Sequence, residues 1–373
     1  MPNVSILAWR PDVLAQYLPG IKSEFSQSNI FACCQQKGLQ KVREMGVQAF
    51  CAEEANELFK YEEPKLQFSI AHCRNLMQLA SMSLGDAPLV LLDDDVQPQK
   101  GCESKFSSSF SKYALVQGAC IGSIGNGIYM LVHFFDHLLE HSNDADFAPV
   151  ADLMLRGVVR THSPPSSLRS LIGGFLGINA SLKAKQAFFP TKYPVDDHFY
   201  EFCCRHSFPT LKFMDESTLP SEIPLTMHNT VPSNSTSKLV DHYILYAKSA
   251  IVESYSYFRL CGRIPKLING RHTLVKIANF DPESMCSHTA AEAALEKFRA
   301  AAQYHLQTGF GEPIDSQLKR VASLGEKDLF VPQEELEAEW ENFGQEQKWM
   351  QQAQAILRQS PQNIAQALFA GKA

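Results

Sequence analysis

Short apolar segments that alternate with helical patterns dominate the first quarter of the chain. The apolar segments are 4–8, 29–33, 47–51 and 89–92. The amphipathic patterns between them, which are typical of helices, are 12–22, 38–45 and 69–83. Strands that are apolar on both faces are typical of a parallel sheet covered by helices on each side. We therefore predict an α/β protein with a mostly parallel central sheet.

The C-terminal third has a different character. The 373 residues exceed what one compact core usually holds, so we expect a main domain with a further part. Additional strand-like runs lie at 114–127 and 172–179, whereas helical patterns at 240–258, at 290–306 and from Pro332 onward fill the remainder. We predict a main domain over 1–238, with halves of about 1–110 and 111–238. An amphipathic helix and connection at 239–283 and a helical C-terminal appendage at 284–373 would follow.

The composition excludes several classes of protein. With 45% apolar and 20% charged residues the chain is expected to fold, and a net charge of −6 gives no reason to expect a nucleic-acid partner. The ten cysteines include no CxxC spacing, which favours reduced thiols over a disulfide framework or a zinc site. We expect neither a signal peptide nor a membrane span.

Three consecutive aspartates, Asp93, Asp94 and Asp95, follow the apolar segment 89–92. The carboxyl ends of parallel strands are where α/β sheets bind ligands. Because side chains alternate along an extended segment, we expect Asp93 and Asp95 to face one way and Asp94 the other. Two carboxylates on one side would form a hard oxygen site for Mg²⁺ or Mn²⁺. An acidic turn that caps the next helix is the alternative.

The stretch SIAHCRNLMQLASMSLGDAPLVLLDDDVQPQKG resembles the donor-site segment of GT-A glycosyltransferases, especially family 2. In that family an Ala-Arg-Asn helix, a Gly-Asp turn and an apolar strand precede a DxD motif, which Asp93 and Asp95 match here. The resemblance implies that Asp93 lies near the nucleotide and that Asp95 binds the metal. Arg74 would assist the diphosphate, and its alternative is a surface helix arginine. Trp9 and Asp94 are further donor-site candidates.

A second stretch, LIGGFLGINASLKAKQAFFPTKYPVDDHFYEFCCR, is similar to the acceptor half of these enzymes. The resemblance implies that Gly173, Gly174 and Phe175 line the acceptor pocket. It also implies that the pair Asp196-Asp197 opens a helix, with Asp197 deprotonating the acceptor hydroxyl in an inverting enzyme. An acidic pair that only caps the helix is the alternative.

His228 follows a further short strand, and many GT-A enzymes use a late histidine as an additional metal ligand. A structural histidine is the alternative. The polar loop 229–237 is expected to close over the donor.

The resemblance covers about 4–236 and implies a metal-dependent glycosyltransferase that needs Mn²⁺ or Mg²⁺. It would move a sugar from a nucleotide-diphosphate donor, with a UDP-sugar expected, to a glycan, lipid-linked or other hydroxyl acceptor. We expect a cytoplasmic protein. The amphipathic helix at 240–258 could contact the inner membrane face peripherally or pack on the core.

The sequence departs from the family pattern at two places, and the first of them favours the adaptor alternative named below. FACCQQKG stands where the family has an Asp-Asp pair that helps hold the base, and Trp9-Arg10-Pro11 replaces the usual turn after the first strand. A retaining GT-A enzyme is one alternative, and a non-catalytic adaptor with a degenerate transferase fold is another. A sugar-nucleotide pyrophosphorylase is disfavoured, because it needs a Gly-rich, Arg-containing loop after the first strand.

Overall fold

The computed structural model describes residues 1–62, 69–122, 138, 161–162, 174–183, 196–214, 225–228, 239–268, 271–281, 289–312, 314–325, 328 and 331–370. The chain forms two compact units, each built from segments that are distant in sequence. Unit 1 comprises Met1–Gly122, His162–Asn229 and Asn342–Ala373, and unit 2 comprises Ser123–Thr161 and Thr230–Glu341. Among the described residues, no helix combines the length and the apolar character needed to cross a membrane.

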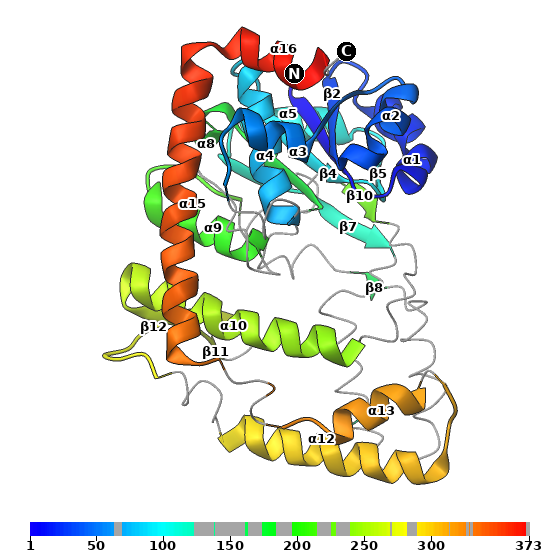
Figure 1. Ribbon diagram of the computed structural model, residues 1–373, viewed down its shortest axis with the longest axis vertical. Helices are drawn as coiled ribbons and strands as arrows, with labels where there is room; N and C mark the ends of the chain where they lie inside the picture. Colours follow the sequence, from blue (N-terminus) through cyan, green and yellow to red (C-terminus); the bar gives the residue numbers. More distant parts are fainter. Residues whose placement is uncertain are drawn as a thin grey trace. The chain divides into compact units, whose positions relative to one another are not determined.

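A six-stranded sheet with the order β3-β2-β1-β4-β9-β6 forms the centre of unit 1 (Figure 1). Its strands are β1 (Asn3–Ala8), β2 (Asn29–Cys34), β3 (Gln48–Cys51), β4 (Leu89–Asp93), β6 (Leu115–Gln117) and β9 (Phe175–Ile178). The first four are parallel, and β9 lies antiparallel between β4 and β6. The predicted mostly parallel α/β sheet is confirmed.

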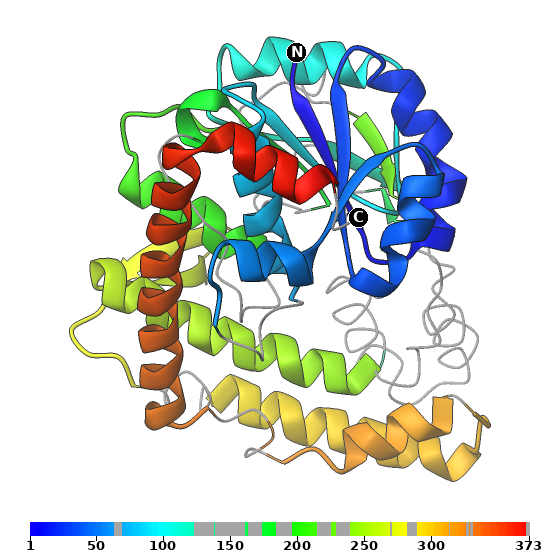
Figure 2. The same ribbon diagram turned by 45° about the horizontal axis from the view of Figure 1, so that its top comes forward.

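Helices cover both faces of this sheet (Figure 2). On one face lie α1 (Pro11–Glu24), α2 (Gln36–Glu44) and α5 (Cys102–Phe110). The helices α3 (Ala52–Leu58), α4 (Ile70–Ser83) and α16 (Pro361–Ala370) pack beside β1, β2 and β3 on the other. Successive side chains of β1 serve the two faces, because Val4 and Ile6 join the cluster around α1 whereas Asn3 Nδ2 donates to Ser81 Oγ of α4 at 3.1 Å. All six residues of β1 are therefore buried.

A second sheet has the order β5-β10-β7-β8. Its strands are β5 (Val96–Pro98), β10 (Leu225–His228), β7 (Ala119–Gly122) and β8 (Thr161–His162). β10 is antiparallel to β5 and parallel to β7. Because only Asp94 and Asp95 separate β5 from β4, this pairing brings β10 close to the end of β4. The short helices α8 (Ala180–Lys183) and α9 (Asp196–Ser207) complete the middle of unit 1.

The end of the chain returns to unit 1 through α15 (Gln333–Gln359) and α16. Trp349 Nε1 donates to the carbonyl oxygen of Phe59 at 3.1 Å. The ring of Phe369 packs edge-on against Phe31 and Phe50. The stretch 284–373 is therefore not one appendage as expected, because its part from Asn342 onward supplies apolar groups to the core of unit 1.

Unit 2 contains α10 (Leu239–Cys261), the antiparallel hairpin of β11 (Arg263–Ile268) and β12 (Arg271–Lys276), α12 (Thr289–Thr308) and α13 (Ile314–Ala322). The helices expected at 240–258 and 290–306 are confirmed. Ile251 and Tyr255, two members of the apolar stripe of α10, pack in one cluster with Val331 and Leu336. Part of the stripe thus serves core packing within this unit.

Candidate functional site

The carboxyl ends of β1 and β4 are neighbours at one edge of the sheet. From β1 the chain continues to β2 and β3 on one side, whereas β4 lies on the other side, so the strand order reverses between β1 and β4. Ligands of open α/β sheets bind outside the strand ends at such a topological switch point. Trp9 and Arg10 follow β1 here, and the aspartate triplet begins at the last residue of β4.

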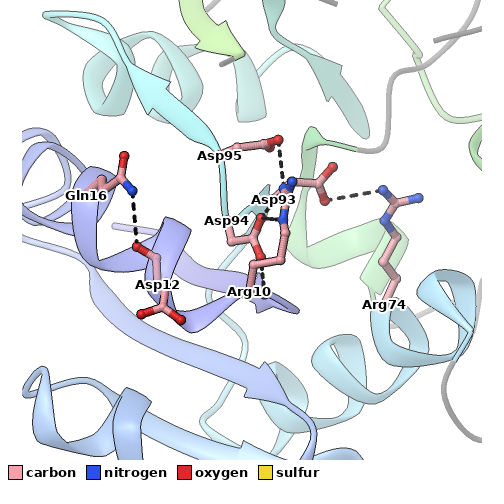
Figure 3. A network of polar contacts seen from close by, with 7 residues as sticks. All are labelled: Arg10, Asp12, Gln16, Arg74, Asp93, Asp94 and Asp95. Carbon is pink, nitrogen blue, oxygen red and sulfur yellow. Dashed lines mark hydrogen bonds and ion pairs between the residues drawn. The ribbon is translucent and has the colours of Figure 1, made fainter. Parts of the chain in front are cut away.

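Arg10 and Asp94 form the centre of the polar network at this edge (Figure 3). The Asp94 carboxylate accepts from the backbone N–H of Arg10 at 2.6 Å, from its Nε at 3.1 Å and from its Nη2 at 2.5 Å. Arg10 is the residue before α1, so Asp94 also places a negative charge at the start of that helix. Burial raises the pKa of Asp94 to about 6, while Arg10 acts in the opposite direction, so the carboxylate is ionised at pH 7.

Asp95 shares the same arginine, since its Oδ2 accepts from Arg10 Nη2 at 2.8 Å. The expectation that Asp93 and Asp95 face one way and Asp94 the other is wrong. The strand ends at Asp93, and Asp94 and Asp95 form the turn into β5, so the alternation of an extended segment does not reach them. Both turn carboxylates converge on Arg10 instead (Figure 3).

Arg74 faces Asp93 from α4, with its Nη2 at 3.5 Å from Asp93 Oδ1 (Figure 3). Ser69 is the N-cap of this helix, and its Oγ accepts a hydrogen bond from the backbone N–H of His72 at 3.1 Å. This cap stabilises the first turns of α4, which carry Arg74. Arg74 is buried, whereas the Asp93 side chain is 27% exposed, so Asp93 is the most accessible carboxylate of the triplet. The structure therefore places Arg74 beside the first aspartate of the triplet, and its role toward a diphosphate stays a prediction.

The backbones of two other predicted segments pair with Asp93 or with residues adjacent to the triplet. The Asp93 N–H donates to the carbonyl oxygen of Gly174 at 2.9 Å, and Phe175 pairs with Leu92 in the β4–β9 ladder. His228 pairs with Val96, the residue that follows Asp95. The antiparallel insertion of β9 and the pairing of β10 thus gather segments that are far apart in the sequence.

Other predicted site residues are described only in part. Gly173 and the loop 229–237 lie outside the described residues, as do the side chains of Phe175 and His228. The helix expected after the acidic pair is confirmed, because α9 begins at Asp196, but the side chains of Asp196 and Asp197 are also outside the description. Their catalytic roles stay predictions.

A divalent cation at this site would use the carboxylates of the triplet. The oxygen donors of Asp93 and Asp95 suit Mg²⁺ or Mn²⁺ chemically. Their present arrangement is closed, because Arg10 holds Asp95 and Arg74 faces Asp93. Within the described part of the chain, no group of three or more His, Cys, Asp or Glu side chains is arranged to hold a metal ion. The carboxylate oxygens therefore suit such a cation chemically, and in this structure they contact arginine side chains.

Sequence reasoning missed Arg10, which contacts two of the three aspartates. The available signal was a cation directly after the first parallel strand, at the edge where the acidic triplet was expected. The residues of the departure FACCQQKG belong to β2 and to the start of α2. Cys33 and Cys34 are buried within β2, and Gln36 N–H, at the start of α2, donates to the Glu53 carboxylate at 3.0 Å. Glu53, from the segment after β3, therefore satisfies a backbone N–H in the first turn of α2.

No protein-family model and no curated protein matches the chain. Among solved structures it is similar to the mannosyltransferase PcManGT from Pyrobaculum calidifontis, which was solved in complex with GDP-Man and Mn²⁺. The sequence identity is 12%, the match covers 96% of this chain and 86% of that chain, and the TM-score is 0.43. A likeness at this level carries neither substrate nor mechanism over to the present chain.

Proposed function

We propose that the chain is a glycosyltransferase that takes its sugar from a nucleotide-diphosphate donor. The supporting observation is the group of Arg10, Arg74 and three aspartates at the switch point between β1 and β4. Guanidinium groups match phosphate oxygens in charge and in geometry. Trp9, which is 38% exposed next to Arg10, offers an aromatic face to the base or the sugar.

The proposed cofactor is Mn²⁺ or Mg²⁺, with Asp93, Asp95 and His228 as its ligands. When bound, the cation would neutralise negative charge on the departing nucleoside diphosphate. Arg74 would bind the same diphosphate from α4, a role supported by the 3.5 Å separation between its Nη2 and Asp93 Oδ1. Asp94 would hold the start of α1 in place through Arg10.

The acceptor is proposed to be a sugar, lipid-linked or other hydroxyl that enters beside Gly173, Gly174 and Phe175. The hydrogen bond from Asp93 N–H to Gly174 O supports this placement, because it joins the acceptor segment to the donor side. Asp197 would accept the proton of the attacking hydroxyl, with Asp196 next to it, and the anomeric configuration would invert. A UDP-sugar is the first donor to test.

Slow hydrolysis of the donor tests this function without knowledge of the acceptor. We would measure release of nucleoside diphosphate from UDP-, GDP-, CDP- and TDP-sugars with Mn²⁺ and with EDTA. Asp93→Ala should lower the release from the preferred donor roughly 100-fold, because it removes a proposed ligand of the cation that stabilises the departing diphosphate. Asp12→Ala is the matched control, since Asp12 is an exposed carboxylate in the first turn of α1.

The outcomes separate the alternatives. NMR of the released sugar distinguishes an inverting from a retaining reaction by its anomeric configuration. If the folded wild-type chain releases no diphosphate from any donor, the enzyme proposal fails and the non-catalytic adaptor takes its place.

A further inference from the structure

The Arg10 guanidinium lies between the two turn carboxylates, Asp94 and Asp95. It contacts Asp94 Oδ1 at 2.5 Å and Asp95 Oδ2 at 2.8 Å (Figure 3). Carboxylates that bind Mn²⁺ or Mg²⁺ must turn their oxygens to the ion, and a cationic group among them repels it. A cation can therefore use Asp95 fully only after this guanidinium has moved.

We propose that Arg10 is a resident counter-cation that competes with the divalent metal for Asp95 and passes to the donor's phosphates when donor and metal bind. This inference rests on the proposed function. Metal alone should then bind weakly, because it must displace Arg10 without any compensating partner for the guanidinium. Metal and nucleotide diphosphate should bind synergistically, because the phosphates receive the arginine that the metal releases.

The contacts of Arg10 suit such an exchange. Its side chain is 39% exposed, so the guanidinium can turn away from the carboxylates without crossing the core. Its backbone N–H donates to Asp94 Oδ2 at 2.6 Å, a contact that the side chain can leave intact. Asp94 therefore keeps its hold on the start of α1 while Asp95 becomes available. A planar guanidinium can form the same paired hydrogen bonds with phosphate that it forms with carboxylate.

Binding of Mn²⁺ alone, followed by the electron paramagnetic resonance signal of the free ion, tests the competition without nucleotide. We expect Arg10→Gln to bind Mn²⁺ roughly tenfold more tightly than the wild type, equivalent to about 1.4 kcal/mol. Arg10→Gln combined with Asp95→Asn should lose that gain. Lys41→Gln removes the same charge from an exposed ion pair with Asp12 on the same unit, and it should bind Mn²⁺ as the wild type does.

Arg10→Lys is a second test variant, to be used if Arg10→Gln does not fold. A lysine keeps the charge but cannot span two carboxylates as a guanidinium does, so its Mn²⁺ affinity should fall between those of the wild type and Arg10→Gln. Circular dichroism would establish that each variant is folded.

The inference is overturned if folded Arg10→Gln and Arg10→Lys bind Mn²⁺ no more tightly than Lys41→Gln. Arg10 would then be a structural clamp for the turn. This result is independent of the proposed function, which fails instead when wild-type protein releases no diphosphate from any nucleotide sugar. A gain in Mn²⁺ affinity that Asp95→Asn cancels would support the competition even then.

Discussion

Replacing Asp94 by alanine should destabilise unit 1 by about 2–3 kcal/mol. Its side chain is 2% exposed and accepts three hydrogen bonds from Arg10, two from the side chain and one from the backbone at the start of α1. Removing one partner of a fully buried ion pair costs about 3–5 kcal/mol. The cost expected for Asp94→Ala is below this range because the Arg10 side chain is 39% exposed, so water can solvate its guanidinium once Asp94 is gone.

Urea unfolding at pH 7, followed by circular dichroism, measures this change in the free energy of unfolding. Asp94→Asn retains one oxygen for the Arg10 N–H, so it should cost less than alanine, about 1 kcal/mol. Asp12→Ala is the matched control, because Asp12 also forms an ion pair at α1 but is 84% exposed, and its loss should cost about 0.5 kcal/mol or less. If Asp94→Ala is as mild as Asp12→Ala, Asp94 does not hold this turn and the structural role given to it is wrong.

Three further predictions concern pH, packing and chemistry. Burial lowers the pKa of His72 to about 3, below its unfolded value of about 6.5. The free energy of unfolding should therefore decrease as pH falls below 6.5, by about 2 kcal/mol at pH 5. Urea unfolding of His72→Gln at several pH values should lack that decrease. Gly177→Ala should cost about 1–3 kcal/mol in urea unfolding, because its Cβ would lie 2.7 Å from a phenylalanine ring of α5. Gly344→Ala, which meets open space in α15, should instead be neutral or stabilising, and equal effects of the two substitutions would refute the packing argument. Asp197→Asn should keep donor binding by calorimetry but lower sugar transfer roughly 100-fold or more, and normal transfer would remove Asp197 as the base.

The central architecture was predictable because its determinants are local. The apolar runs of β1 and β4 are buried on both faces of the sheet. Burial on both faces requires apolar side chains at consecutive positions, and such a run is visible in the sequence. The aspartates at the end of β4 follow directly from that strand, so their place at the carboxyl edge could be expected as well.

Long-range partners could not be predicted in the same way. Arg10 and Asp94 lie far apart in the sequence, and only the parallel pairing of β1 with β4 brings their turns together. An amphipathic stripe likewise predicts that one face of a helix will be buried, but it does not identify the element against which that face packs. Trp349 and Phe369 therefore gave no sign that the C-terminal helices would complete unit 1.

Calorimetric titration of the wild-type chain with UDP, GDP, CDP and TDP, each with Mn²⁺ and with EDTA, tests the donor site most directly. Our account predicts that one diphosphate binds with micromolar affinity in the presence of Mn²⁺, that EDTA weakens this binding, and that Asp95→Ala abolishes it. Absence of binding by every diphosphate to folded protein would contradict the account, as would binding that Asp95→Ala leaves unchanged.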